Sequence, residues 1–88
     1  MIEMELALTN QAGLHARPAA QFVQKAAGFK SKVSIAAGGK TADAKSILAV
    51  MSLALTTGMK FTLTADGEDE QECIAALKEL VESNFGEG

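Results

Sequence analysis

The chain has 88 residues, of which 48% are hydrophobic and 22% charged, and its formal net charge at pH 7 is −3. These values predict one folded domain over residues 1–88, and they argue against disorder and against binding to nucleic acid or an anionic membrane, because the sequence has no basic block to neutralise phosphates. No apolar run reaches membrane-spanning length and Cys73 is the single cysteine, so we expect a cytoplasmic protein in a reducing compartment.

The first third of the chain predicts a strand followed by a helix. Residues 2–8 alternate apolar and polar side chains, which is the pattern of a half-buried strand. From Ala16 onwards the apolar residues recur at helical spacing. Pro18 is tolerated in a first turn, where backbone N–H groups have no helical partner. We therefore expect a helix that begins at or just after His15 and ends near Gly28.

The middle of the chain predicts a hairpin and a short helix. Residues 32–37 alternate again, and Gly38 and Gly39 supply a two-residue turn into a short strand that runs through Thr41. Ser46 then precedes the apolar stretch ILAVM and has the chemistry of a helix N-cap.

The last third predicts one more strand and one more helix. Residues 60–66 alternate, and the acidic run from Glu68 to Glu72 suits the positive end of a helix dipole. The expected buried stripe of this helix is Ile74, Leu77, Leu80 and Val81. The element order βαββαβα with short connections predicts an α+β open-faced sandwich, in which three helices cover one face of a four-stranded, largely antiparallel sheet.

His15 and Arg17 are the candidates for chemistry. His15 lies where a glycine-containing loop meets a helix start, a position whose backbone donors and dipole favour an anion. Arg17 can add a bidentate phosphate clamp, and a neutral imidazole can attack a phosphoryl group. From the spacing alone, a surface N-cap at His15 and a solvated charge at Arg17 are the favoured interpretation. The residues by themselves lead no further than an anion site with a candidate nucleophile.

Two motifs together carry a family resemblance. GLHARPAA at residues 13–20, followed by KSILAVMSL at residues 45–53, resembles the HPr family, the histidine-containing phosphocarriers of the bacterial phosphotransferase sugar-uptake system. The resemblance implies that His15 accepts a phosphoryl group from Enzyme I, which is charged by phosphoenolpyruvate, and passes it to the IIA domains of sugar permeases. It implies that Arg17 is the phosphate partner, and that the protein is a carrier and not an enzyme.

The resemblance also implies a regulatory role for Ser46, which matches the phosphorylated serine of Gram-positive members. A Ser46 kinase/phosphorylase and a transcriptional regulator are then possible partners. The N-cap role alone would also explain a serine here, and the two roles are compatible. Gln24 and Ala27 replace lysines of enteric relatives, which favours a Gram-positive-like type, and Ala54 replaces a frequent glycine.

The short helix after Ser46 is too small to bury all its apolar residues. We expect Ile47, Leu48 and Met51 to contribute to partner binding, on one face made by the starts of the first two helices. Cys73 is interpreted as a packing residue and the acidic run as a solvated helix start. No cofactor, metal, nucleic acid or membrane insertion is predicted, and we expect a monomer.

Two rival functions remain open at this level. One is a purely regulatory binding module that acts through the Ser46 face. The resemblance argues against it, because the paralogues that act only as regulators lack the phosphorylatable histidine. The other is a nitrogen-branch relay, with the same chemistry and regulatory acceptors.

Overall fold

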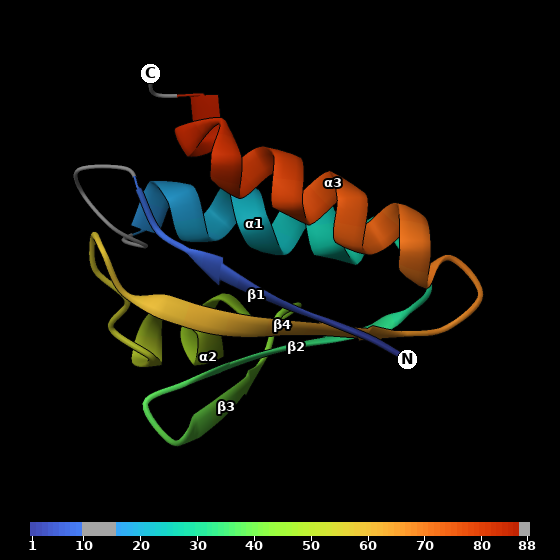
Figure 1. Ribbon diagram of the computed structural model, residues 1–88, viewed down its shortest axis with the longest axis horizontal. Helices are drawn as coiled ribbons and strands as arrows, with labels where there is room; N and C mark the ends of the chain where they lie inside the picture. Colours follow the sequence, from blue (N-terminus) through green and yellow to red (C-terminus); the bar gives the residue numbers. More distant parts are fainter. Residues whose placement is uncertain (10–15, 87–88) are drawn as a thin grey trace.

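The computed structural model describes residues 1–9 and 16–86, so His15 lies outside the described residues. Its elements follow the expected order βαββαβα, with a short 3₁₀ turn, η1, at the end (Figure 1). Their bounds are β1 Ile2–Ala7, α1 Ala16–Ala27, β2 Lys32–Ala37, β3 Lys40–Asp43, α2 Ile47–Ser52, β4 Lys60–Asp66, α3 Glu70–Glu82 and η1 Asn84–Gly86.

The four strands form one sheet in the order β1-β4-β2-β3, and every neighbouring pair is antiparallel. The predicted hairpin is confirmed: Ala37 pairs with Lys40 across the two-residue turn. Gly38 and Gly39 have φ values of +56° and +80°, which a type I′ turn requires and which glycine adopts without steric cost. The strand β3 continues to Asp43, two residues beyond the expected end, because Ser34 of β2 still pairs with it.

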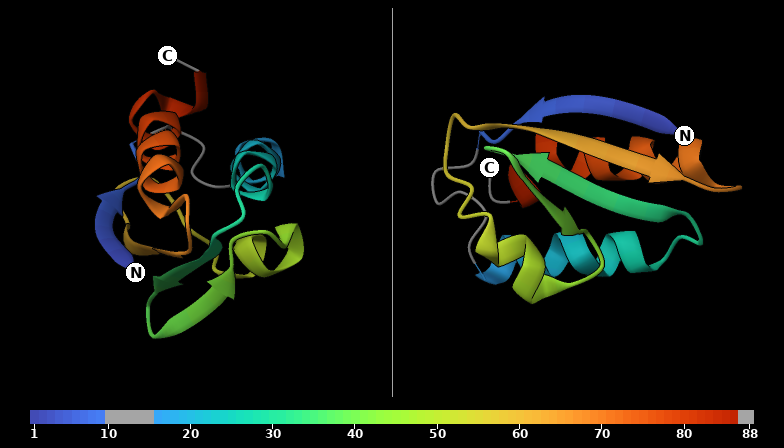
Figure 2. Two further views of the ribbon diagram at one scale, coloured as in Figure 1. Left: turned by 90° about the vertical axis from the view of Figure 1, so that its right-hand side faces the viewer. Right: turned by 90° about the horizontal axis from the view of Figure 1, so that it is seen from below.

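The three helices lie on one face of the sheet, as predicted (Figure 2). The alternation along β1 and β4 points their apolar side chains toward this face, so that Leu6 and Leu63 are buried. From α1 and α3, Phe22 and Leu77 fill the space between the layers. Of the expected α3 stripe, Leu80 is only half-buried, because it packs at the edge of the core.

The helix α2 begins and ends with two local features of the backbone. Ser46 is its N-cap, and the Ser46 Oγ accepts a hydrogen bond of 3.4 Å from the backbone N–H of Ala49, which confirms the predicted cap. After Leu53 the chain turns through Ala54, whose φ of +53° is left-handed. A side chain with a Cβ is disfavoured in that conformation, which gives a physical reason for the glycine expected at this position.

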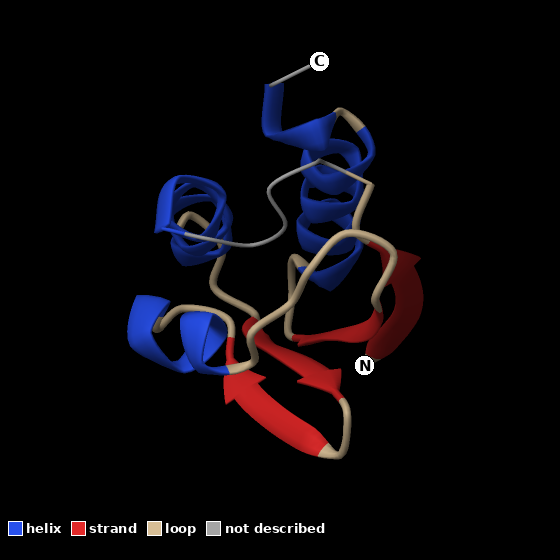
Figure 3. Ribbon diagram, turned by 90° about the vertical axis from the view of Figure 1, so that its left-hand side faces the viewer, coloured by secondary structure: helices blue, strands red, loops and turns tan. Residues whose placement is uncertain are grey.

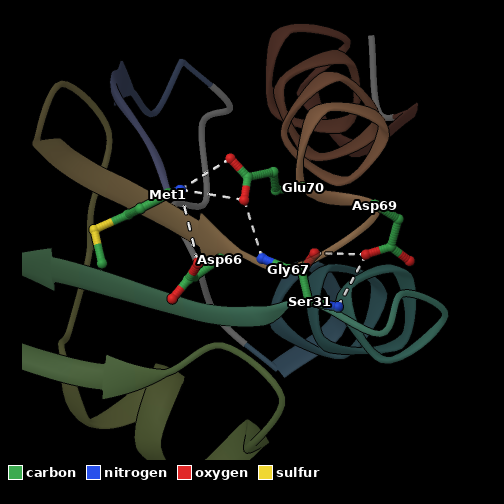
Figure 4. Close-up of polar contacts among 6 residues, drawn as sticks. All are labelled: Met1, Ser31, Asp66, Gly67, Asp69 and Glu70. Carbon is green, nitrogen blue, oxygen red and sulfur yellow. Dashed lines mark hydrogen bonds and ion pairs between the residues drawn. The ribbon is translucent and has the colours of Figure 1, made fainter.

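The acidic run at residues 68–72 is not simply a solvated helix start, which corrects the interpretation of the sequence. The carboxylate of Asp69 accepts hydrogen bonds from the backbone N–H of Ser31 at 2.9 Å and from the Ser31 hydroxyl at 2.5 Å (Figure 4). It also accepts one of 2.8 Å from the backbone N–H of Lys30. We call this set of bonds the Asp69 clasp. It joins the start of α3 to the connection between α1 and β2, and its bonds hold the pKa of Asp69 below the ordinary value, with the Ser31 hydroxyl the largest cause.

A second acidic residue is also engaged. Glu70 accepts a hydrogen bond of 3.0 Å from the backbone N–H of Gly67 and forms an ion pair of 3.0 Å with the amino group of Met1 (Figure 4). The Gly67 hydrogen bond is the largest cause that lowers the pKa of Glu70. A Cβ on Gly67 would lie 2.7 Å from the Cα of Ser31, so this turn packs closely against the clasp. The β4–α3 connection is therefore fixed from two sides.

The left-handed Ala54 gives a first prediction. The Ala54→Gly variant should raise the free energy of unfolding by about 0.5–1 kcal/mol, since glycine relieves the steric cost of the left-handed backbone, and the melting temperature by a few degrees. Thermal unfolding measures this. The control Ala75→Gly, on the exposed side of α3, should be destabilised by about 1 kcal/mol. A destabilised Ala54→Gly would contradict the account of this turn.

The Asp69 clasp gives a second prediction, on pH dependence. Because the folded pKa lies below the ordinary value of 3.8, the ionised carboxylate stabilises the fold above that pH, and the contribution is lost as the pH falls through the folded pKa. Asp69→Asn should therefore lower the urea midpoint at pH 7, and its difference from the original chain should shrink toward pH 2. The control is Glu68→Gln, an exposed neighbour. A pH-independent difference would show that the charge is not what stabilises the clasp.

Candidate functional site

Arg17 is exposed in the first turn of α1, beside the buried Pro18 and Ala19 that anchor this end of the helix. The first turn of α1 contains no acidic residue. The guanidinium and the positive end of the helix dipole therefore act in the same direction, and an anion in front of this turn meets no like charge from α1 itself. The observed start of α1 at Ala16 agrees with the predicted helix start.

The helices α1 and α2 lie side by side but run in opposite directions (Figures 1 and 3). Lys45, just before α2, donates a hydrogen bond of 2.9 Å from its Nζ to the carbonyl oxygen of Phe29, just after α1. The start of α2 therefore lies toward the end of α1. The prediction that the starts of both helices form one face is wrong. The lengths of the connections did not predict the relative directions of α1 and α2, which the contact between Lys45 and Phe29 shows.

The end of α2, not its start, therefore lies toward the start of α1 (Figures 1 and 2). The helix has six residues, so at about 1.5 Å per residue it spans about 9 Å. Interactions between exposed charges are largely screened beyond about 8 Å at physiological ionic strength, which is close to the length of α2. Met51 is consequently nearer the start of α1 than Ser46 is.

The outer side of α2 is apolar and open to solvent, as the sequence predicted. The exposed fraction is 37% for Ile47, 79% for Leu48 and 39% for Met51, whereas Val50 is completely buried. We call these three exposed residues the α2 patch. A helix this short can direct only one or two of its residues into the core, and an apolar group of this kind beside a helix start is typical of a docking surface.

Ser46 is half-buried at the start of α2, where it accepts from the N–H of Ala49. Its own backbone N–H donates to the carbonyl oxygen of Asp43 at 3.1 Å, and the Asp43 carboxylate accepts from the N–H of Lys45 at 2.9 Å. No acidic residue lies in the first turn of α2. An added negative charge at Ser46 would meet backbone donors and the favourable end of a short helix.

Other chemistry finds no support among the residues that the structure describes. Cys73 is completely buried, and burial raises the pKa of its thiol, so it packs in the core as expected and is not an activated nucleophile. Within residues 1–9 and 16–86, no group of three potential ligands could hold a metal ion, and no helix is long and apolar enough to cross a membrane.

Sequence reasoning missed the residues that orient these helices. Asp69 accepts hydrogen bonds from the backbone N–H and the hydroxyl of Ser31, which lies 38 positions earlier in the sequence. Lys45 donates to the carbonyl oxygen of Phe29, which lies 16 positions earlier. Local patterning cannot reveal such long-range partners. A single serine between the first helix and the second strand was the one available signal, since a hydroxyl that becomes completely buried needs a partner.

The chain matches one family model over residues 2–83, described as the PTS HPr component phosphorylation site. It is 47% identical to the phosphocarrier protein HPr of Haemophilus influenzae, over 90% of this chain and 91% of that protein. The structure superposes on a crystal structure of HPr from Thermoanaerobacter tengcongensis with a TM-score of 0.97 and 46% identity, covering 100% and 99% of the two chains.

A third relative is the HPr-like protein Crh of Bacillus subtilis, which is 46% identical over 93% of this chain and 96% of its own. A crystal structure of Crh, described as a swapped, intertwined dimer, has a TM-score of 0.76 and covers 96% of this chain and 97% of its own. A Bacillus protein among the neighbours agrees with the Gram-positive-like type. The expected monomer stays a prediction, because a protein of this family is described as a dimer.

The α2 patch gives a third prediction. Leu48→Asp should change the free energy of unfolding by no more than about 0.5 kcal/mol, because the side chain is mostly exposed. The matched variant Val50→Asp, which places an unpaired charge in the core two residues away, should unfold the domain. Circular dichroism during heating distinguishes them. An unfolded Leu48→Asp would make Leu48 part of the core and remove the patch.

Proposed function

Because the chain belongs to the HPr family of phosphotransferase-system phosphocarriers, we propose that His15 accepts a phosphoryl group from Enzyme I and passes it to the IIA domains of sugar permeases. The observation that carries the proposal is the match of residues 2–83 to a family model described by its phosphorylation site. The relay takes place in the cytoplasm, and the protein is a phosphorylated carrier and not an enzyme.

The proposed step is an in-line transfer to the imidazole. A lone pair on a ring nitrogen of His15 forms the new P–N bond while the bond from phosphorus to Enzyme I breaks, and that electron pair returns to the donor. In the second transfer the IIA nucleophile takes the phosphoryl group and the pair returns to the imidazole. Arg17 supplies charge-assisted donors to the phosphoryl oxygens, and its exposed position in a first turn without acidic residues supports this role.

We propose that partners dock on the α2 patch and the adjacent start of α1. Ile47, Leu48 and Met51 supply the apolar contact, and Met51 lies toward the end of α2 that is nearer the start of α1. A flexible methionine side chain can repack against several partners, as a carrier between Enzyme I and different IIA domains requires. The exposed Arg17 lies at the polar rim of such an interface.

Ser46 is proposed as a regulatory phosphorylation site, with a kinase/phosphorylase and a transcriptional regulator as further partners. The N-cap geometry supports a phosphate that leaves the fold intact, since backbone donors at the start of α2 accept negative charge. The phosphate would stand at the end of α2 that lies away from the start of α1. It would therefore act on docking at the neighbouring Leu48, where an apolar surface must be desolvated, more than on His15 directly.

A purely regulatory module is the second candidate function, because the chain is as similar to Crh as to HPr. A regulator of this kind would bind partners through phosphorylated Ser46 and would take no phosphate from phosphoenolpyruvate. The nitrogen-branch relay differs only in its acceptors. Transfer from the phosphorylated chain to sugar-specific IIA domains separates that branch from the sugar branch.

The fourth prediction tests the phosphocarrier function. With Enzyme I and phosphoenolpyruvate, the chain should gain one phosphate that is acid-labile and base-stable, and His15→Ala should gain none while melting as before. Arg17→Lys should slow the transfer about tenfold or more, the cost of one lost donor, without a large fall in melting temperature. Phosphate on His15→Ala would refute the assignment of the acceptor, and an unchanged rate in Arg17→Lys would refute its role.

The fifth prediction tests regulation at Ser46. Ser46→Asp should slow phosphorylation of His15 by Enzyme I and keep the melting temperature, because a carboxylate can still cap α2. Ser46→Ala should transfer at the original rate but lose about 0.5–1 kcal/mol of stability with the cap. The rates and the unfolding curves of the three chains are compared directly. Equal rates in all three would leave Ser46 as a helix cap only.

A further inference from the structure

The strand β1 forms one edge of the sheet, because the strand order places β4 on one side of it and no described strand on the other. Figure 2 shows β1 at the outer margin of the sheet, on the side away from α2. An edge strand presents backbone N–H and C=O groups that no neighbour pairs, and such an edge can accept an extended chain as a further strand. The residues along β1 therefore decide which kind of chain could pair with it.

The hydrogen bonds at the end of β1 identify which of its backbone groups point outward. Leu8 donates its backbone N–H to the carbonyl oxygen of Met59 at 3.0 Å, so Leu8 bonds toward the strand β4. In an antiparallel pair, alternate residues bond to the partner strand. The even-numbered residues of β1 therefore bond to β4, whereas Glu3, Glu5 and Ala7 direct their N–H and C=O groups away from it.

Two of these outward-facing residues also carry uncompensated negative charge. Glu3 and Glu5 are exposed, and the residues opposite them on β4 are Thr64 and Thr62, so no cation lies directly across the strand pair. Among the described residues, the ion pairs are those of the Met1 amino group, and neither glutamate takes part in them. Backbone groups that are free to bond and carboxylates without a cation thus occur on the same two residues.

A second copy of β1 fits this edge poorly. The two antiparallel registers with the longest overlap are centred on Met4 or on Glu5. The first register would place Glu3 directly opposite Glu5 of the other copy, and the second would place the two Glu5 side chains opposite each other. Like charges directly opposite in a ladder are destabilising. The edge therefore disfavours self-association through β1 and favours a strand of the opposite charge.

The other edge of the sheet differs from β1. The strand β3 has four residues, against six for β1, and Lys40 and Asp43 at its ends carry opposite charges. A short edge strand with a lysine is protected against pairing. Along β1, by contrast, Ile2 and Met4 are half-buried on the face that the helices cover, where they pack against the core. A strand added to β1 would therefore meet carboxylates on one face and apolar side chains on the other.

We propose that the edge of β1 binds an extended segment of a partner protein in which lysine or arginine alternates with apolar residues. The added strand pairs antiparallel with β1 and bonds to the outward backbone groups of Glu3, Glu5 and Ala7. Its cationic residues lie opposite Glu3 and Glu5, and its apolar residues lie beside Ile2 and Met4. Because this edge is on the opposite side of the domain from α2, the segment can bind without covering the α2 patch. Such binding does not require phosphoryl transfer.

A synthetic peptide in which lysine alternates with valine is the probe, and a scrambled peptide of the same composition is its control. Binding is followed by ¹H–¹⁵N spectra and by amide hydrogen exchange. At saturation with the alternating peptide, the amides of Glu3, Glu5 and Ala7 should exchange about tenfold more slowly or less, whereas those of Met4 and Leu6, which already bond to β4, should change little. The scrambled peptide should give neither effect. Protection elsewhere on the domain, or equal effects of the two peptides, would overturn the proposal.

Charge reversal tests the role of the two carboxylates. Glu3→Lys combined with Glu5→Lys should weaken binding of the lysine peptide about tenfold or more and should instead bind a peptide in which glutamate alternates with valine. The single variant Glu5→Gln should lose part of the affinity. The matched control combines Glu79→Lys with Glu82→Lys, at two exposed positions on α3, and has the same net charge as the double variant. An equal loss of affinity in this control would show general electrostatic attraction and would remove the edge as the site.

The oligomeric state of the free chain decides between a partner segment and a second copy. Sedimentation at the concentrations of the titration should show a monomer, and the amides of Glu3, Glu5 and Ala7 should exchange rapidly before peptide is added. A dimer in which these three amides are already protected would assign the edge to a second copy of the chain and contradict the proposal.

Discussion

The carboxylate of Asp69 is the interaction on which the placement of the helices depends. It accepts three hydrogen bonds from two consecutive residues, Lys30 and Ser31, and thereby fixes the start of α3 against the junction of α1 and β2. The carbonyl oxygen of Phe29, just before that junction, accepts a hydrogen bond from the Lys45 ammonium, which holds the start of α2 toward the same end. Four elements are thus joined by backbone groups at one end of the domain, where a buried hydroxyl and a carboxylate satisfy one another.

Bonding at that end leaves the other end available for function. Because α1 is held where it finishes, its start with Arg17 lies at the far end of the helix, beside the end of α2, where Met51 is exposed. Among residues 1–9 and 16–86, the left-handed residues other than glycine are Ala54, Asn84 and Phe85, and they belong to segments at this same end. The hydrophobic core lies between the two ends of the domain. The end with the start of α1 therefore carries the backbone strain, while the hydrogen bonds of Asp69 stabilise the opposite end.

Patterns that repeat locally predicted most of the fold. Period-two alternation, the Gly38–Gly39 turn and the Ser46 cap each depend on neighbours in sequence, and the structure has them where they were expected. The Asp69 clasp and the opposite directions of α1 and α2 were not predictable, because both depend on contacts between distant residues. For the candidate site, composition and spacing predicted an anion-binding helix start and an exposed apolar patch. The assignment of His15 as phosphoryl acceptor came from the resemblance, since no pattern of charge or spacing identifies a phosphate donor.

The division of the domain into a bonded end and a functional end can be tested by comparing ¹H–¹⁵N spectra of the chain before and after phosphorylation by Enzyme I. We predict that the shifted amides belong to the start of α1, the exit of β1, the loop before β4 and η1. The amides of Lys30 and Ser31, which donate to Asp69, should not move. Shifts at those two amides comparable to the shift at Arg17 would contradict it, because the Asp69 clasp would then respond to the phosphate along with the site.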